Sequence, residues 1–314
     1  MRFGSYVRRI ARFARDTDQV RTQRLRWHAF PLVARLSPFV GVEHDGVRYV
    51  ISTRERRGVG LGTFVTGTFD EEVLRRMLLE LEKHLGITTL RGMTVLEVGA
   101  NIGTETVSLL KRHEVERVVA FEPDPENARL LRANLALNGV HDRAEVHEMA
   151  LSNVDTTLLL ECSAENWGDH RIRIADAELA DRLPDHYNEA ERVTVEVHAR
   201  RIDSLAESGE LDLAAVDLVW MDAQGHEGHV LAGAQPLMAA GVPVLTEYWP
   251  YGLARAGGLD RFHALVAEGY GAIVDLQSNR DEPPVTVDPA RITTLADRYS
   301  DEAGAYTDLL LLPK

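Results

Sequence analysis

The sequence predicts an α/β protein with a doubly wound, mostly parallel β-sheet and helices on both of its faces. From residue 93 onward, short apolar runs of strand length alternate with stretches that suit helices, which is the pattern of such a sheet. The first unit is the clearest, because the apolar run from Met93 to Val98 meets the glycine-rich turn Gly99-Ala-Asn-Ile-Gly103 and then a helix. Glycines let the backbone approach a ligand, and a helix start presents free N–H groups. This unit therefore predicts a nucleotide-type site.

Length and composition restrict the class of protein. The chain has 314 residues, of which 45% are apolar, so one large α/β domain with additions is expected. A formal net charge of −14 argues against a general nucleic-acid binder, which needs clustered basic residues. The single cysteine, Cys162, excludes an internal disulfide. No apolar run has the length of a membrane span and no cleavable leader is recognisable, so a cytoplasmic protein without membrane insertion is expected.

Residues 1–90 are predicted to form a cap on a main domain of residues 91–314. The cap carries three local patterns: a helical spacing at residues 7–15, two alternating strands around Asp45-Gly46 within residues 40–52, and a helix that opens at residues 68–72. A glycine-rich segment, residues 58–67, lies between the second and third.

The start of the cap is strongly basic. Residues 1–36 hold nine arginines against Asp16 and Asp18, a local charge of +7, so the remainder carries −21. Such an arm can contact a membrane surface, a partner or a nucleic acid. We interpret it as a solvated or loosely packed helix, with these contacts as the alternative.

The main domain is predicted to contain seven strands. They are expected near residues 93–98, 117–122, 144–149, 216–222, 242–247, 271–276 and 309–312. Residues 155–200 are less regular, since they contain Asn166-Trp-Gly168 and Pro184. We interpret them as a loop-rich excursion that carries groups facing the substrate.

The glycine-rich turn favours a cofactor without a pyrophosphate. A dinucleotide loop has glycine at its second conserved position, where the pyrophosphate meets the backbone, whereas this chain has Asn101 there. S-adenosylmethionine fits such a loop, with its amino group near Glu97. Glu122 ends the second strand, 19 residues past Gly103, where a carboxylate accepts the two ribose hydroxyls.

Two alternatives remain at this point. A nicotinamide-dependent oxidoreductase is disfavoured by Asn101 and by the absence of a Tyr-x-x-x-Lys pair. A catalytically silent module that keeps the fold and binds the cofactor is the other alternative.

Several spaced blocks resemble the FkbM family of S-adenosylmethionine-dependent methyltransferases. They are Leu96-Glu-Val-Gly-Ala-Asn-Ile-Gly103, Ala120-Phe-Glu-Pro-Asp-Pro-Glu-Asn127 with Leu131, Asn134 and Asn138, Ala150-Leu-Ser152, and Trp220-Met-Asp-Ala-Gln-Gly-His-Glu227 with Leu231 and Gly233. The resemblance implies a class I methyltransferase fold with strand order 3-2-1-4-5-7-6, the last strand antiparallel, and O-methylation of a hydroxyl, often on a sugar or natural product. It assigns these residues to the cofactor: Glu97, Gly99, Asn101, Gly103, Glu122 and Ala150, the last near the adenine.

The chain departs from this family at the fourth strand. Many relatives read Lys-x-Asp-x-Glu-Gly-x-Glu, whereas here Trp220 stands in place of the Lys and Gln224 in place of the first Glu. The change leaves the cofactor inference intact, removes any catalytic part for those two residues, and is compatible with a different acceptor or with a silent module.

The candidate catalytic residues follow the fourth and fifth strands. Asp222 is the first candidate for a base or for positioning the acceptor, with helix capping as the alternative. His226 is the second, because imidazole titrates near neutrality, with a surface helix position as the alternative. Glu247 is the third, and together with Asp222 it forms a weak candidate site for a divalent cation. Three aromatic residues are candidates for an acceptor pocket or for the core: Trp167, Trp249 and Tyr251.

Overall fold

The computed structural model describes residues 17–68, 70–173, 185–279, 282–300 and 303–314. The helix expected at residues 7–15 lies outside these ranges. Among the described helices, none combines the length and the apolar character that a membrane crossing requires.

An eight-stranded sheet forms the centre of the molecule, in the order β13-β12-β14-β11-β10-β3-β4-β5. Its strands are β3 (Thr94–Val98), β4 (Arg117–Phe121), β5 (Ala144–His147), β10 (Leu218–Met221), β11 (Val244–Tyr248), β12 (Ala272–Asp275), β13 (Val285–Val287) and β14 (Thr307–Leu312). Neighbours from β5 to β11 are parallel, and β14 runs antiparallel between β11 and β12. The predicted order 3-2-1-4-5-7-6 is therefore confirmed, with β13 as an edge strand that the sequence analysis did not anticipate.

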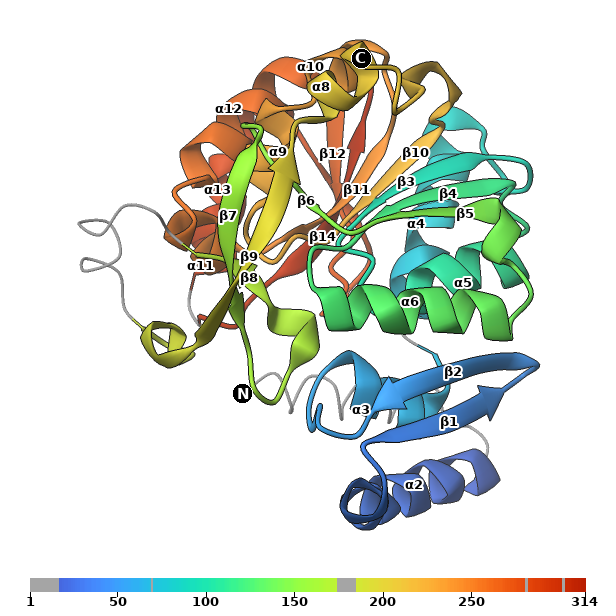
Figure 1. Cartoon of the computed structure of the whole chain (residues 1–314). Helices are drawn as coiled ribbons and strands as arrows, with labels where there is room; N and C mark the ends of the chain where they lie inside the picture. The colour runs from blue at the N-terminus through green and yellow to red at the C-terminus, as the bar shows by residue number, and fades with distance from the viewer. Residues whose placement is uncertain (1–16, 69, 174–184, 280–281, 301–302) are drawn as a thin grey trace.

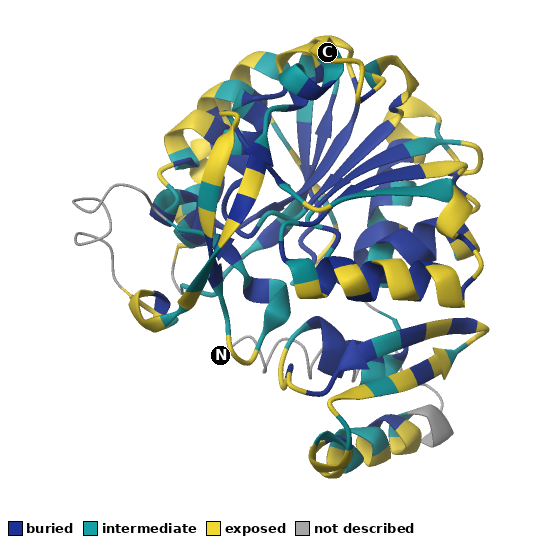
Figure 2. Ribbon diagram, in the orientation of Figure 1, coloured by how far each residue is buried: buried dark blue, intermediate teal, exposed yellow. Residues whose placement is uncertain are grey.

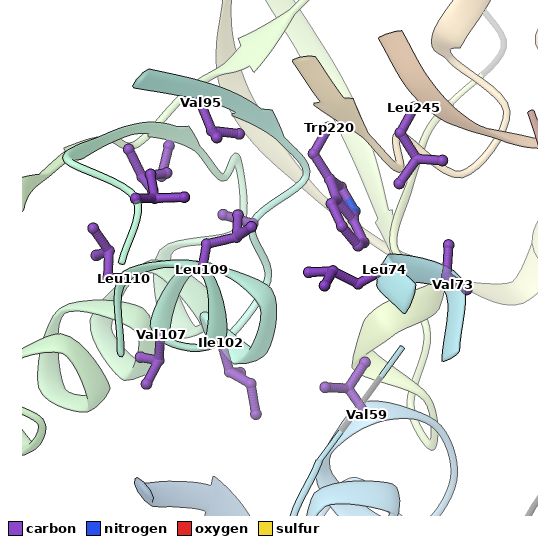
Figure 3. Packing of buried hydrophobic residues seen from close by; sticks show 14 of the residues in the cluster. Val59, Val73, Leu74, Val95, Ile102, Val107, Leu109, Leu110, Trp220 and Leu245 are labelled. Carbon is purple, nitrogen blue, oxygen red and sulfur yellow. The ribbon is translucent and has the colours of Figure 1, made fainter. Parts of the chain in front are cut away.

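Helices cover both faces of this sheet, as predicted. Successive strand residues point to opposite faces, so Val95 and Leu96 belong to two separate hydrophobic clusters. The first cluster contains side chains from α4 (Glu71–Leu85), α5 (Thr104–Arg112) and α6 (Pro125–Leu137), and Figure 3 shows Trp220 of β10 against Leu74 of α4 within it. The second contains side chains from α9 (Glu227–Ala232) and α12 (Leu259–Gly269). Burial on both faces explains why the strands are almost uniformly apolar.

Four strands within the described parts of residues 150–200 form a second sheet, so the prediction of a loop-rich excursion missed these strands. Its strands are β6 (Ala150–Leu151), β7 (Thr156–Cys162), β8 (Arg171–Ile172) and β9 (Val193–Arg200), in the order β6-β9-β7-β8. The segment Val193-Thr-Val-Glu-Val-His-Ala-Arg200 alternates with period two, which is a strand pattern. The prediction missed this strand because it gave more weight to the turn residues at 166–168 and 184.

The range predicted to form the cap contains a helix α2 (Thr17–Leu36), a hairpin of β1 (Phe39–His44) and β2 (Val47–Ser52), a helix α3 (Val59–Thr66) and also α4, which packs on the main sheet. The hairpin prediction is confirmed, and the turn residues Asp45 and Gly46 have φ of 51° and 76°, as a tight two-residue turn requires. The glycine-rich segment forms α3, with Gly58 and Gly67 at its two ends.

Asn134 of α6 and Asn138, directly after its end, attach the hairpin to this helix. Asn134 Oδ1 accepts the Val50 N–H at 2.6 Å, and Asn134 Nδ2 donates to the Val50 carbonyl at 3.2 Å. One helical turn later, Asn138 makes the same pair of bonds with Arg48, at 2.9 and 2.6 Å. The two amides thus take the place of a neighbouring strand at the exposed edge of β2.

Candidate active site

One pocket lies where the loops that follow β3, β4 and β10 meet, and it encloses about 860 Å³ with its open mouth included. Most of the predicted site residues line it: Glu97, Gly99, Asn101, Glu122, Ala150, Asp222 and His226. Gly103 and Glu247 are not among its lining residues. The carboxyl ends of parallel strands at a change of strand order are where α/β sheets bind ligands, and β3 has β4 on one side and β10 on the other.

The glycines of the turn have a packing role that the sequence analysis did not foresee. Gly99 has a φ of +83°, and a Cβ there would lie 1.9 Å from the Asp222 carbonyl oxygen. A Cβ on Gly103 would lie 2.4 Å from Leu131 Cδ1. The glycines therefore let the loops after β3 and β10 touch and let α5 approach α6. Contact between Gly99 and a cofactor remains a prediction.

Glu122 is held at the pocket wall by backbone donors. Its Oε2 accepts the Asn101 N–H at 2.7 Å and its Oε1 accepts the Asp124 N–H at 2.8 Å. The side chain is 4% exposed, and burial raises the pKa of its carboxyl to about 8, against the two backbone N–H groups that lower it. A carboxylate has about four acceptor positions, so Glu122 keeps acceptor capacity for a pair of hydroxyls.

Glu97 lies deeper, below the same turn. Thr106 Oγ1 donates to Glu97 Oε2 at 2.6 Å, and burial raises the pKa of Glu97 to about 8. Glu105, on the first turn of α5, also lines the pocket, and burial together with Asp70 and Glu97 raises its pKa. A cationic group is the natural complement to such a cluster of carboxyls.

The far end of the pocket is apolar. Phe121, Met149 and Ala150 line it together with Leu160 and Ile172 of the second sheet. A flat, apolar ring fits a slot of this kind. The sequence analysis missed Leu160 and Ile172 because it did not recognise β7 and β8.

The predicted aromatic residues separate into two groups. Trp167 lines the pocket, and its carbonyl accepts the side-chain N–H groups of Asn101 and Asn127, both at 3.4 Å. Trp249 is fully buried and donates through Nε1 to the Ala303 carbonyl at 2.6 Å. Tyr251 is absent from the lining residues, so Trp249 and Tyr251 pack in the protein rather than in this pocket.

The cap completes the pocket wall through Val59 and Asp70. Behind that wall, Glu55 is fully buried and accepts the Gly60 N–H at 2.9 Å. The N–H groups of Val59, Trp167 and Gly168 also lower its pKa, which burial raises to about 8. The Glu55 carboxyl thus binds the start of α3 and lies close to the Trp167 loop.

Changing Glu55 to glutamine is therefore expected to loosen this wall. The glutamine keeps the size but brings an NH₂ group towards backbone N–H donors. We expect cofactor affinity to fall about tenfold, since a buried donor left without an acceptor costs about 1–3 kcal/mol, with kcat changed little. Calorimetric Kd values and steady-state kinetics measure the two effects. Glu80→Gln is the matched control, since Glu80 is 8% exposed and pairs with Lys83 on α4; an equal loss in both variants would contradict this role.

Asp222 and Glu247 are linked through the residue that departs from the family pattern. Gln224 Nε2 donates to Asp222 Oδ1 at 2.5 Å and to Glu247 Oε2 at 3.0 Å. Gln224 has a φ of 51° and Gly225 a φ of 101°, a sharp turn that folds the amide back between the two carboxylates. Asp222 reaches the pocket and Glu247 lies behind it.

Glu227 adds a third carboxylate beside Asp222 and Glu247. It braces the loop through one oxygen, because Oε1 accepts the N–H groups of Ala223 and Gly225 at 2.9 and 3.2 Å. Burial and then Asp222 raise the pKa of Glu227 to about 7. One oxygen each from Asp222, Glu227 and Glu247 lie within 4.8 Å of one another. The third oxygen ligand that a divalent cation needs is therefore present beside the two expected ones.

His226 lines the pocket, and the alternative of a surface helix position is wrong, because the residue is only 7% exposed. Its Nε2 lies 2.9 Å from Ser152 Oγ. Burial, His229 and Arg261 lower its pKa to about 3. The imidazole is therefore neutral at physiological pH, and titration near neutrality is not a reason to make it the base.

The comparisons with known proteins agree with the resemblance. A model of the methyltransferase FkbM domain matches residues 97–248, a range that contains every predicted site residue. The 2-O-methyltransferase NoeI of Sinorhizobium fredii is 30% identical over 185 residues, which are 56% of this chain and 73% of that protein. Methyltransferase 1 of Beauveria bassiana is 25% identical over 143 residues, 44% of this chain and 57% of that protein. An O-methyltransferase from Bacillus cereus in complex with SAH gives a TM-score of 0.42 at 14% identity, covering 78% of this chain and 82% of that one.

The family assignment rests on the relative at 30% identity, of which this chain covers more than two thirds, and on the domain model. The pocket also suits the methyl donor of that family, since it offers a carboxylate for two hydroxyls, a carboxyl cluster for a cation and an apolar slot. The chain belongs to the FkbM family of S-adenosylmethionine-dependent methyltransferases.

Proposed function

We propose that this methyltransferase acts in the cytoplasm and transfers the methyl group of S-adenosylmethionine to a hydroxyl oxygen of a small molecule or sugar. The observation that carries the proposal is Asp222, a carboxylate in the wall of the cofactor pocket that is tied to a second carboxylate through Gln224. The printed name of NoeI, a 2-O-methyltransferase, supports oxygen as the acceptor atom. The net charge of −14 disfavours a nucleic acid as acceptor.

The cofactor is proposed to lie along the pocket from Glu97 to Ala150. Glu122 would hold the ribose hydroxyls, Glu97 would face the amino group, and the adenine would fill the slot beside Ala150. When bound, S-adenosylmethionine supplies a methyl group made electrophilic by its positively charged sulfur. The protein's own tasks are then to align the hydroxyl with that methyl group and to remove its proton.

Asp222 is proposed to accept the hydroxyl proton. Gln224 fixes Asp222 Oδ1 in place, and the carboxylates of Glu227 and Glu247 lie beside it. Glu247 lies behind the pocket and is a positioning residue. His226 is a second acceptor of protons, neutral and in the wall, although its low pKa makes it a weak base.

The test is an assay of purified protein with S-adenosylmethionine carrying a labelled methyl group and separate neutral sugars, amino sugars and phenols. We expect label in a methyl ether for at least one hydroxyl acceptor, identified by mass spectrometry of the product. Transfer to nitrogen or carbon alone would contradict the proposal. Cofactor binding without transfer to any hydroxyl in the panel would instead favour the silent module.

Removal of divalent cations is expected to leave transfer unchanged. The Gln224 amide already bridges Asp222 and Glu247, which gives those two oxygens a partner without an ion. Activity measured before and after treatment with EDTA checks this. Loss of activity that Mg²⁺ restores would show that the three carboxylates bind a metal for catalysis.

A further inference from the structure

We propose that the outer face of helix α2 binds an anionic lipid surface. Helix α2 forms the outermost layer of the molecule, on the far side of the β1–β2 hairpin from the main sheet (Figure 1). A helix of 20 residues is about 30 Å long, so it offers an extended surface. This inference is independent of the methyl transfer.

The outer face of α2 carries an apolar stripe. Leu25, Leu32 and Leu36 are spaced by seven and four residues, which places them on one side of a helix. Their exposed fractions are 70%, 61% and 78%, and Phe39, at the start of β1, is 42% exposed. Figure 2 shows helix α2 in a mixture of exposed, intermediate and buried colours. Several exposed leucines on one side of one helix are more than the single exposed apolar side chains that are normal on a protein surface.

The opposite face of α2 is already used for folding. Phe30 is 3% exposed, and its ring lies 5.1 Å from that of Phe64 on α3. Trp27 packs against the same core. The helix is thus apolar on two sides, and the fold itself covers only one of them. The three leucines of the stripe do not pack in the core. A helix that only faces solvent does not require leucines at these positions.

The charge around the leucine stripe indicates that it binds an anionic surface. Arg24 and Arg35 are exposed on α2, and the sequence just before this helix adds Arg2, Arg8, Arg9, Arg12 and Arg15. The local charge of +7 over residues 1–36 contrasts with −21 on the remainder. A second copy of the chain would bring two positive ends together, whereas an anionic bilayer attracts this end and repels the rest. Each arginine near such a surface strengthens binding about fivefold, and the leucines supply the apolar contact.

Vesicle co-sedimentation tests the proposal with the full chain. We expect binding to vesicles of phosphatidylcholine with phosphatidylglycerol, little binding to phosphatidylcholine alone, and loss of binding at about 1 M salt, where the Debye length is about 3 Å. The triple variant Leu25→Gln, Leu32→Gln, Leu36→Gln should weaken the partition coefficient at least about tenfold. The double variant Arg24→Gln, Arg35→Gln should also weaken it about tenfold or more.

Two matched controls separate a lipid site from other causes. Leu79→Gln changes a leucine of α4 that is 51% exposed, and it should leave binding unchanged. Light scattering of the wild type reports the oligomeric state, and a dimer that the triple variant dissociates would overturn the proposal in favour of a second copy. Equal binding to both kinds of vesicle, no binding to either, or equal effects of the stripe and control variants would overturn it as well. Circular dichroism verifies that the variants are folded.

Discussion

Replacing Glu122 by alanine is expected to weaken the binding of S-adenosylmethionine by about 100-fold. The variant removes the carboxylate that is proposed to accept two ribose hydroxyls. A hydrogen bond to a charged group contributes about 1.5–3 kcal/mol, and each 1.4 kcal/mol changes Kd about tenfold, so the loss of two such bonds raises Kd about 100-fold. Titration calorimetry measures the change in Kd. A Kd within about twofold of the wild type would contradict the ribose assignment.

The Glu122→Ala variant needs a control for stability, because the N–H groups of Asn101 and Asp124 lose their acceptor. Unsatisfied buried groups cost about 1–3 kcal/mol each, so the thermal midpoint should fall too. Glu122→Gln retains an acceptor oxygen and should restore part of the midpoint but little of the affinity. Glu126→Ala, whose side chain is 53% exposed, should change neither quantity appreciably.

The affinity for the cofactor should also depend on pH. Burial raises the pKa of both Glu122 and Glu97 to about 8, so both carboxyls are largely protonated at neutral pH without ligand. Hydroxyl donors and a cationic amine favour the ionised form, so affinity is expected to rise as pH increases towards and through 8. In Glu122→Ala the pH dependence of Kd that is due to Glu122 should disappear, whereas the pH dependence that is due to Glu97 should remain.

Replacing Asp222 by asparagine is expected to lower kcat by about 10²–10⁴-fold, the usual contribution of a general base. The amide is nearly isosteric with the carboxylate but cannot take up the hydroxyl proton. The Kd for the cofactor should change by less than about threefold, because no cofactor contact is assigned to the Asp222 side chain. Single-turnover kinetics and calorimetry separate the two quantities.

Glu210→Gln is the matched control for Asp222→Asn, since Glu210 is 50% exposed and lies on a loop that does not line the pocket. It should retain full activity. Wild-type turnover in Asp222→Asn would remove Asp222 from the catalytic residues, and a parallel loss in the control would point to a general effect on the protein.

Local patterns were sufficient to place seven of the eight strands of the main sheet and to predict many residues of the candidate pocket. Each buried strand is an apolar run that ends in a turn, so its position can be read without knowing its neighbours. Glu122 was identifiable because its distance from the glycine turn is fixed by one helix and one strand. The pocket brings it together with Glu97 and Ala150, which lie far apart in the sequence.

The remaining features depend on contacts between distant segments. Nothing near Glu55 in the sequence indicates that its carboxylate meets the Trp167 loop, and nothing near Val59 indicates that the cap completes the pocket wall. Glu227 lies close to Asp222 in sequence, but only the turn at Gln224 brings the carboxylates within 4.8 Å. The low pKa of His226 likewise arises from burial between α9 and the Ser152 loop.

The central claim, that the crevice above Gly99 is a methyl-donor site held by Glu122, is tested most directly by calorimetry of the purified chain with S-adenosylmethionine, S-adenosylhomocysteine and NAD. We predict saturable binding of the first two at one site per chain, weakened in Glu122→Ala, and no measurable heat from NAD. Tight binding of NAD without a response to S-adenosylmethionine would contradict it.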